Sequence, residues 1–169
     1  MSRSSFSGGD TTSGQALAEA WRRFAELNQR YFRGRLRLER LSFNPRFRST
    51  LGTFSTDGRG RAIQLSPFYL RLFGWAELEK VLLHEMIHLQ LGRAGHGAEF
   101  RKLESSIERD YGPLRPRPIP AQAHNYIYIC DRCHLEFGRW RPLKGPCYHR
   151  GCGGRLWRKR GRSLTKSDR

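Results

Sequence analysis

Residues 76–100 read AELEKVLLHEMIHLQLGRAGHGAEF, and this stretch is the most informative part of the chain. No glycine or proline interrupts residues 76–91, and their mostly apolar pattern predicts a helix that is buried on much of its circumference. Within it His84 and His88 lie four residues apart, so both imidazoles face the same side. Glu85 follows the first histidine and points away from that side. This HExxH pattern is typical of a zinc site equipped for hydrolysis.

A third zinc ligand is expected just beyond this helix. Gly92 ends the helix and Gly95 precedes His96, so the chain can turn back and direct another imidazole toward the metal. Three protein ligands leave one position of a tetrahedral zinc open for water. We therefore predict that His84, His88 and His96 bind one catalytic zinc.

The predicted catalytic residue is Glu85, acting as the general base. Two alternatives remain open at this stage. A glutamate from the following helix, Glu99 or Glu104, could replace His96 as the third ligand. The motif residues could also be polar core residues whose hydrogen bonds are made by neighbours, with no metal involved.

Charge distinguishes this chain from an average globular domain. It has 32 Lys and Arg against 15 Asp and Glu, a net charge of +17, and a pI near 10.9. Such an excess favours a polyanionic partner such as nucleic acid, although solubility or an arginine-rich genome would produce the same composition. The 169 residues allow one compact domain and a small additional module.

The first residues carry no apolar stretch of the kind found in signal peptides. Residues 1–14 are rich in Ser, Gly and Thr and predict a disordered leader, and no apolar run reaches the length of a membrane span. We expect a cytoplasmic protein, which includes association with the nucleoid, and no membrane partner. In that reducing compartment we expect the four cysteines to be metal ligands rather than disulfides.

The remainder of the first domain predicts an α+β fold. Residues 12–32 have helical spacing, short alternating runs between 36 and 65 predict three antiparallel strands, and Ser66-Pro67 begins a short helix that ends near Gly74. Phe100, Leu103 and Ile107 indicate a further amphipathic helix that ends at residues 112–113. Alternating prolines over 113–120 then predict an extended linker.

Two cysteine pairs follow the linker. A CxxC pair and a CxxxxC pair are separated by thirteen residues with hairpin signals between them, which predicts a closed, structural zinc site. Its expected ligands are Cys130, Cys133, Cys147 and Cys152. The alternatives are that His134 or His149 replaces one thiolate, or that the CxxC is a redox pair. A module this short needs the metal to fold.

The second module is also the most basic part of the chain. Residues 114–169 contain 14 Lys and Arg against 3 Asp and Glu, a net charge of +11. This favours contact with a nucleic-acid backbone. Several aromatic residues could stack on bases, although some must form the small core: Tyr126, Tyr128, Phe137, Trp140 and Trp157.

Together these motifs resemble the SprT-like family of zinc metalloproteases, which is related to the Spartan proteases that digest proteins crosslinked to DNA. The resemblance covers nearly all of residues 15–157, with FAELNQRYF at 24–32, AIQLS at 62–66, HEMIH at 84–88 and GHGAEF at 95–100. It implies the same three histidine ligands and the same catalytic glutamate. Only seven residues separate His88 from His96, fewer than in Spartan.

We therefore expect an α+β protein in which a small zincin-like metalloprotease domain precedes a zinc ribbon, with one catalytic and one structural zinc. The expected parts are a disordered leader (1–14), the metalloprotease domain (15–112), a proline-rich linker (113–125), the zinc ribbon (126–158) and a basic tail (159–169).

The expected function is hydrolysis of peptide bonds in DNA-associated or DNA-crosslinked proteins by a monomer that binds DNA, single-stranded DNA above all. The alternative is a nucleic-acid-binding zinc protein whose HExxH site is structural or inactive.

Overall fold

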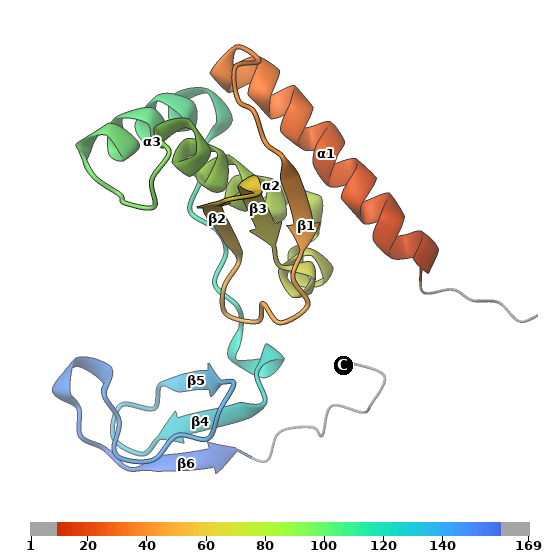
Figure 1. The fold of residues 1–169 in the computed structure, drawn as a ribbon. Coiled ribbons are helices and arrows are strands. Elements are labelled where there is room, and N and C mark those ends of the chain that lie inside the picture. Colours follow the sequence, from red (N-terminus) through yellow and green to blue (C-terminus); the bar gives the residue numbers. More distant parts are fainter. Residues whose placement is uncertain (1–9, 160–169) are drawn as a thin grey trace, which may run out of the picture. The chain divides into compact units, whose positions relative to one another are not determined.

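The computed structural model describes residues 10–159, and these divide between Arg117 and Pro118 into two compact units. Within this range there are three α-helices and two three-stranded sheets, so the expected α+β class is confirmed (Figure 1). No helix in the described range is long and apolar enough to cross a membrane. Residues 1–9 of the leader expected over 1–14, and residues 160–169 of the tail expected over 159–169, lie outside the described residues. Residues 10–14, which were expected in the leader, instead belong to the first helix.

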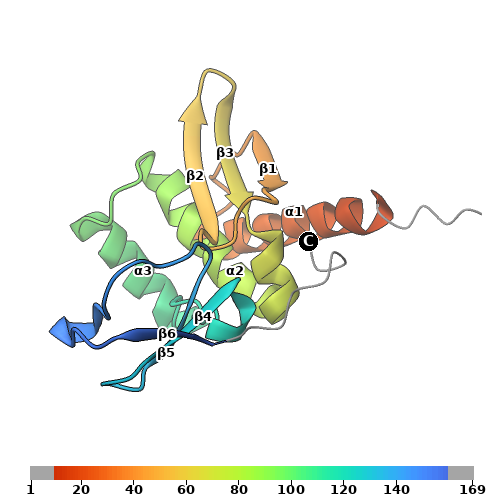
Figure 2. The ribbon, with the colours of Figure 1, turned by 90° about the horizontal axis from the view of Figure 1, so that it is seen from below.

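The first unit contains all three α-helices and one sheet. Its elements, in chain order, are α1 (Asp10–Phe32), β1 (Arg40–Phe43), β2 (Gly52–Asp57), β3 (Gly60–Leu65), α2 (Pro67–Leu91) and α3 (Ala98–Tyr111). Helix α2 packs against β2 and β3, and α1 contacts both β1 and α2 (Figure 1). The β2–β3 hairpin extends beyond the helices, and residues 55–57 of β2 are accordingly exposed (Figure 2).

The sheet of the first unit is mixed, so the prediction of three antiparallel strands was wrong in part. The strand order is β1-β3-β2; β3 pairs antiparallel with β2 but parallel with β1. The physical reason is the connection from β1 to β2. Residues 44–51 make a loop too long for a tight hairpin, and this lets β3 enter the sheet between the two strands.

Helix α2 has two parts because Gly74 interrupts it with non-helical dihedral angles (φ 75°, ψ −173°). The first part begins as expected: Ser66 is the N-cap, its hydroxyl accepts a hydrogen bond from the Tyr69 N–H at 3.0 Å, and Pro67 follows. The second part is the long helix that carries the metal motif. It ends at Gly92, which has a left-handed conformation (φ 65°) that favours glycine.

The start of the proline-rich segment packs on the first unit. Leu114 is buried, and its N–H donates to Glu108 on α3 at 2.9 Å. The Arg117 N–H donates to Glu77 on α2, and its carbonyl accepts from the Tyr69 hydroxyl at 3.1 Å. Residues 114–117 are therefore fixed to the metal-motif unit.

The second unit is a three-stranded antiparallel sheet of β4 (Tyr126–Cys130), β5 (Glu136–Arg139) and β6 (Leu156–Lys159), with β4 in the centre. A short 3-10 turn, Ala121–Ala123, precedes it, and a second such turn, His149–Gly151, lies between β5 and β6. Tyr128 and Phe137 stack with ring centroids 6.2 Å apart, so these two predicted aromatics contribute to the core of the unit.

Candidate metal centres

The second part of α2 presents the first two histidines from a rigid base. Leu82, Leu83, Met86 and Ile87 are all essentially inaccessible to solvent, so the helix around the motif is anchored in the core. His84 and His88, one turn apart, have ring centroids 4.9 Å from each other. His88 is buried, whereas about a third of the His84 side chain is exposed. One edge of the pair is therefore open to solvent.

His96 completes a cluster with these two residues. Its Nε2 lies 3.0 Å from Nε2 of His84, and the three ligand nitrogens lie within 4.8 Å of one another. Two imidazoles bound to one tetrahedral zinc have their nitrogens about 3.3 Å apart, because each Zn–N bond is about 2.0–2.1 Å long. The three histidines that the sequence singled out thus fit a single zinc ion.

The loop between α2 and α3 is tied to the cluster at both ends. Nδ1 of His88 lies 3.0 Å from the Arg93 carbonyl oxygen, so this nitrogen carries the proton and Nε2 keeps its lone pair for a metal. Arg101 on α3 donates to the carbonyl of His96 at 2.9 Å. These contacts hold the second and third histidines without help from a metal.

Phe100 packs against all three histidines, a contact that the sequence alone did not reveal. Its ring centroid lies 4.9 Å from that of His84, 4.6 Å from that of His88 and 4.5 Å from that of His96. Phe100 is 1% exposed. The spacing of Phe100 four residues after His96 was the available signal, but the helical pattern assigned it only to the core.

His84 and His88 are held in the neutral form that binds metals. Burial, together with the smaller effect of the neighbouring imidazoles of His88 and His96, lowers the pKa of His84 to about 4. Burial also lowers the pKa of His88. Both rings are therefore uncharged at neutral pH.

Glu85 lies in the core beside the cluster. Its side chain is buried, and burial raises its pKa to about 7, against a backbone hydrogen bond from Phe54 on β2 that lowers it. A carboxyl group that titrates near neutral pH is suited to accept and return a proton. Strand β2 passes so close that a Cβ at Gly52 would lie 3.0 Å from Cγ of Glu85 and 2.7 Å from Cγ1 of Val81.

The two glutamates considered as alternative third ligands lie outside the histidine cluster. Glu99 forms an ion pair with Arg93, and 70% of its side chain is exposed. Oε1 of Glu104 lies 3.7 Å from Nδ1 of His84, the nitrogen that faces away from His96. Burial and the nearby Glu108 carboxylate raise the pKa of Glu104.

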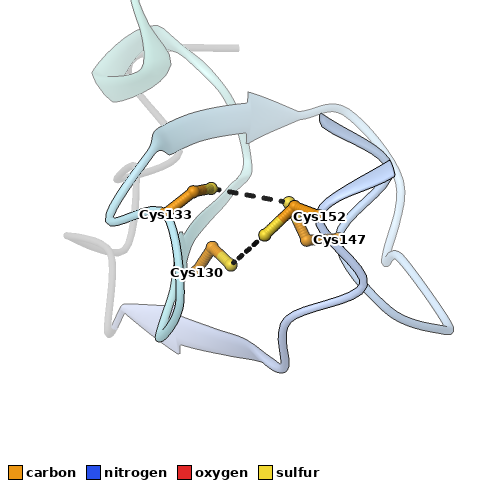
Figure 3. Close-up of side chains that lie close together, drawn as sticks. All are labelled: Cys130, Cys133, Cys147 and Cys152. Carbon is orange, nitrogen blue, oxygen red and sulfur yellow. Dashed lines mark hydrogen bonds between the residues drawn. The ribbon is translucent and has the colours of Figure 1, made fainter. Parts of the chain in front are cut away.

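The four cysteines of the second unit form a separate cluster (Figure 3). The Sγ atoms of Cys130 and Cys152 are 3.8 Å apart, and those of Cys133 and Cys147 are 3.9 Å apart. Sulfurs on one tetrahedral zinc are about 3.8 Å apart, because each Zn–S bond is about 2.3 Å long, whereas a disulfide needs about 2.05 Å. The arrangement fits a zinc ion held by four thiolates.

Turns of the backbone bring the two cysteines of each pair together. The His134 N–H donates to the carbonyl of Cys130 at 3.0 Å, which closes the first turn, and the Gly153 N–H donates to that of Cys147 at 3.1 Å, which closes the second. Backbone hydrogen bonds from Cys133 and Arg132 lower the pKa of Cys130 to about 7, toward the thiolate form that binds metals. Neither His134 nor His149, the alternative ligands, belongs to the cluster.

A helix-borne HExxH motif closed by a third histidine, and followed by a four-cysteine sheet unit, defines a class of proteins with two potential metal centres. Comparison with known proteins identifies the family. Residues 20–121 match the model of the SprT-like family, and the chain belongs to it.

Individual relatives agree with this assignment. The chain is 32% identical over 126 residues to the protein SprT-like of Geobacillus sp. strain WCH70, a match that covers 68% of this chain and 78% of the relative. It is 30% identical over 137 residues to the protein SprT-like of Staphylococcus aureus, covering 75% of this chain and 86% of that one. It is also 31% identical over 136 residues to the DNA-dependent metalloprotease SPRTN of Danio rerio, covering 75% of this chain but 20% of that longer protein.

Proposed function

We propose that this chain is a zinc-dependent peptidase that acts on DNA-associated proteins. The observation that carries the proposal is the convergence of His84, His88 and His96 beside the buried carboxyl group of Glu85. The similarity to a protein named DNA-dependent metalloprotease supports it. His84, His88 and His96 would hold the catalytic zinc, and the four cysteines a structural one.

The chemistry divides between the metal and Glu85. When bound, zinc supplies the positive charge that polarises the scissile carbonyl and acidifies the attacking water. Glu85 takes the proton of that water during attack and returns it to the leaving amine. Its raised pKa of about 7 suits both halves of this transfer, because the carboxyl group gains and loses a proton near neutral pH.

Comparing wild-type protein with the Glu85→Gln variant tests the peptidase. Glutamine keeps the size of the side chain and removes the base, so zinc content should remain and turnover of a DNA-binding protein substrate should fall by roughly 100-fold or more. Glu39→Gln, an exposed change of the same chemistry, is the matched control. Cleavage by the Glu85→Gln variant at the wild-type rate would contradict the proposal.

We also propose that the second unit binds nucleic acid, single-stranded DNA above all. Of the aromatic side chains named from the sequence, Trp157 on β6 is 52% exposed. The guanidinium of Arg155 lies 4.6 Å from the ring centroid of Trp157, and Ile129 of β4 is its cross-strand partner. An exposed ring with an adjacent cation offers stacking to bases and charge to phosphates.

Trp157→Ala should weaken binding of a single-stranded oligonucleotide by roughly 10-fold. Binding by both the wild-type protein and this variant should weaken steeply as the salt concentration rises. Leu135→Ala, which truncates another exposed apolar side chain of the same unit, should leave binding unchanged. DNA binding by a wild-type chain that cleaves no protein, with or without DNA, would instead favour a nucleic-acid-binding protein with an idle HExxH site.

A further inference from the structure

Two imidazoles of the cluster, those of His84 and His88, each have one nitrogen for a metal and one for a protein partner. Nε2 of His84 faces His96 at 3.0 Å, and its Nδ1 faces Oε1 of Glu104 on α3 at 3.7 Å. His88 follows the same scheme, with its Nδ1 against the Arg93 carbonyl at 3.0 Å. The first two histidines therefore each have an oxygen acceptor on the side away from the cluster.

Glu104 is placed by the same helix that packs on the three histidines. It lies four residues after Phe100, so both side chains project from one face of α3. Phe100 touches every imidazole of the cluster, and Glu104 lies one turn further along. About 30% of the Glu104 side chain is exposed, which leaves its carboxylate free to shift.

We propose that Glu104 is a positioning residue that holds His84 in its ligand orientation. A proton on Nδ1 shared with the Glu104 carboxylate leaves the lone pair on Nε2, the nitrogen that faces the cluster. The 3.7 Å separation is roughly 0.8 Å longer than a hydrogen bond, and a small movement of the glutamate side chain closes it. Its negative charge also strengthens a cation site.

This assignment rests on the proposed function in one respect, since it requires a metal at the three histidines. It also means that Glu104 is not itself the third metal ligand, a role that its sequence position allowed. A ligand would need its oxygen among the metal-facing nitrogens, whereas Oε1 lies on the opposite side of the His84 ring.

The test measures metal affinity rather than activity, on the full chain with both metal centres. Zinc is titrated in competition with a chromophoric chelator, and Co²⁺ replaces zinc so that visible absorption reports the geometry of the histidine site. Glu104→Gln and Glu104→Ala should weaken metal binding at the three-histidine site by roughly 10- to 100-fold and alter its Co²⁺ absorption. The affinity of the four-cysteine site and the helical circular dichroism should not change.

Glu99→Gln is the matched control, because it removes the same charge from the same helix at a residue paired with Arg93. Wild-type affinity in both Glu104 variants would overturn the inference. A second outcome would also overturn it: at saturating zinc, Glu104→Ala loses all metal from the histidine site whereas His96→Ala retains it. Glu104 would then be a ligand. Should wild-type protein bind two metals and lose affinity on Glu104 substitution, yet cleave no protein, the inference stands and the peptidase proposal fails.

Discussion

Replacement of Glu85 by glutamine should stabilise the metal-free protein at alkaline pH, although it removes the base needed for hydrolysis. Burial raises the pKa of Glu85 from 4.5 to about 7. Between these values the folded protein keeps a proton that the unfolded chain has released, so stability falls as the pH rises through this window. Above pH 7 the full cost of burying the carboxylate is present.

The expected size follows from the pKa difference. At about 1.4 kcal/mol per pKa unit, burial of the Glu85 carboxyl group lowers stability by about 3 kcal/mol at pH 8, where the group is ionised. At pH 5, where the folded protein retains the proton, the cost is about 1 kcal/mol. Glutamine does not ionise, so Glu85→Gln should gain about 2 kcal/mol over wild type between these two pH values. The titration of His84 and His88 affects both proteins equally and cancels in the comparison.

Urea unfolding of the chelator-treated protein measures this difference. All three described α-helices belong to the first unit, so the helical circular dichroism signal follows that unit whatever happens to the zinc-free second one. Glu39→Gln is a contrasting variant. The hydrogen bond from the Arg61 backbone lowers the pKa of the exposed Glu39, so removing this carboxylate cannot stabilise the folded protein at high pH. If the stability difference between Glu85→Gln and wild type did not change from pH 5 to pH 8, the buried-carboxyl reasoning would be refuted.

Three further substitutions test the residues that form the cysteine site and that pack the first unit. Cys133→Ser should reduce bound zinc by one ion per chain and unfold the second unit while the helical signal persists, as metal analysis and circular dichroism of the same sample would show. Gly52→Ala should destabilise the first unit by about 1–3 kcal/mol in urea unfolding, because its Cβ would meet Val81 and Glu85, whereas Gly58→Ala enters open space and should be neutral. Asn28→Ala should cost about 1–3 kcal/mol in the same assay, because the buried Asn28 side chain both donates to and accepts from the Leu36 backbone at 3.1 Å; equal stability of this variant and wild type would contradict that role.

The sequence pattern predicted the histidine and cysteine clusters because both depend on local spacing. Four residues of helix bring His84 beside His88, and two short turns bring each cysteine pair together, whatever the rest of the chain does. The cross-contacts between Cys130 and Cys152 and between Cys133 and Cys147 follow once the hairpin closes. Local chemistry of this kind is visible in a single sequence.

Features that depend on long-range packing were not predictable in the same way. The parallel pairing of β1 with β3 depends on the path of residues 44–51, and short alternating strands give no signal for direction. The approach of Gly52 to Glu85 joins residues thirty-three positions apart, and no local sequence pattern predicts it. The sequence favoured His96 as the third ligand, but placing Glu99 and Glu104 outside the cluster required knowledge of where α3 packs.

The short connection between α2 and α3 explains why the third histidine can follow the second so soon. Gly92 reverses the chain direction in a left-handed conformation, and the Arg93 carbonyl that follows accepts a hydrogen bond from Nδ1–H of His88. At the other end Arg101 donates to the His96 carbonyl, and Phe100 packs against all three imidazole rings. Since both ends of the loop are fixed by α2 and α3, the position of the third histidine depends on how these two helices pack rather than on the residues between them. Metal affinity at this site should therefore be more sensitive to substitutions on α3 than to substitutions at the exposed loop residues 94 and 95.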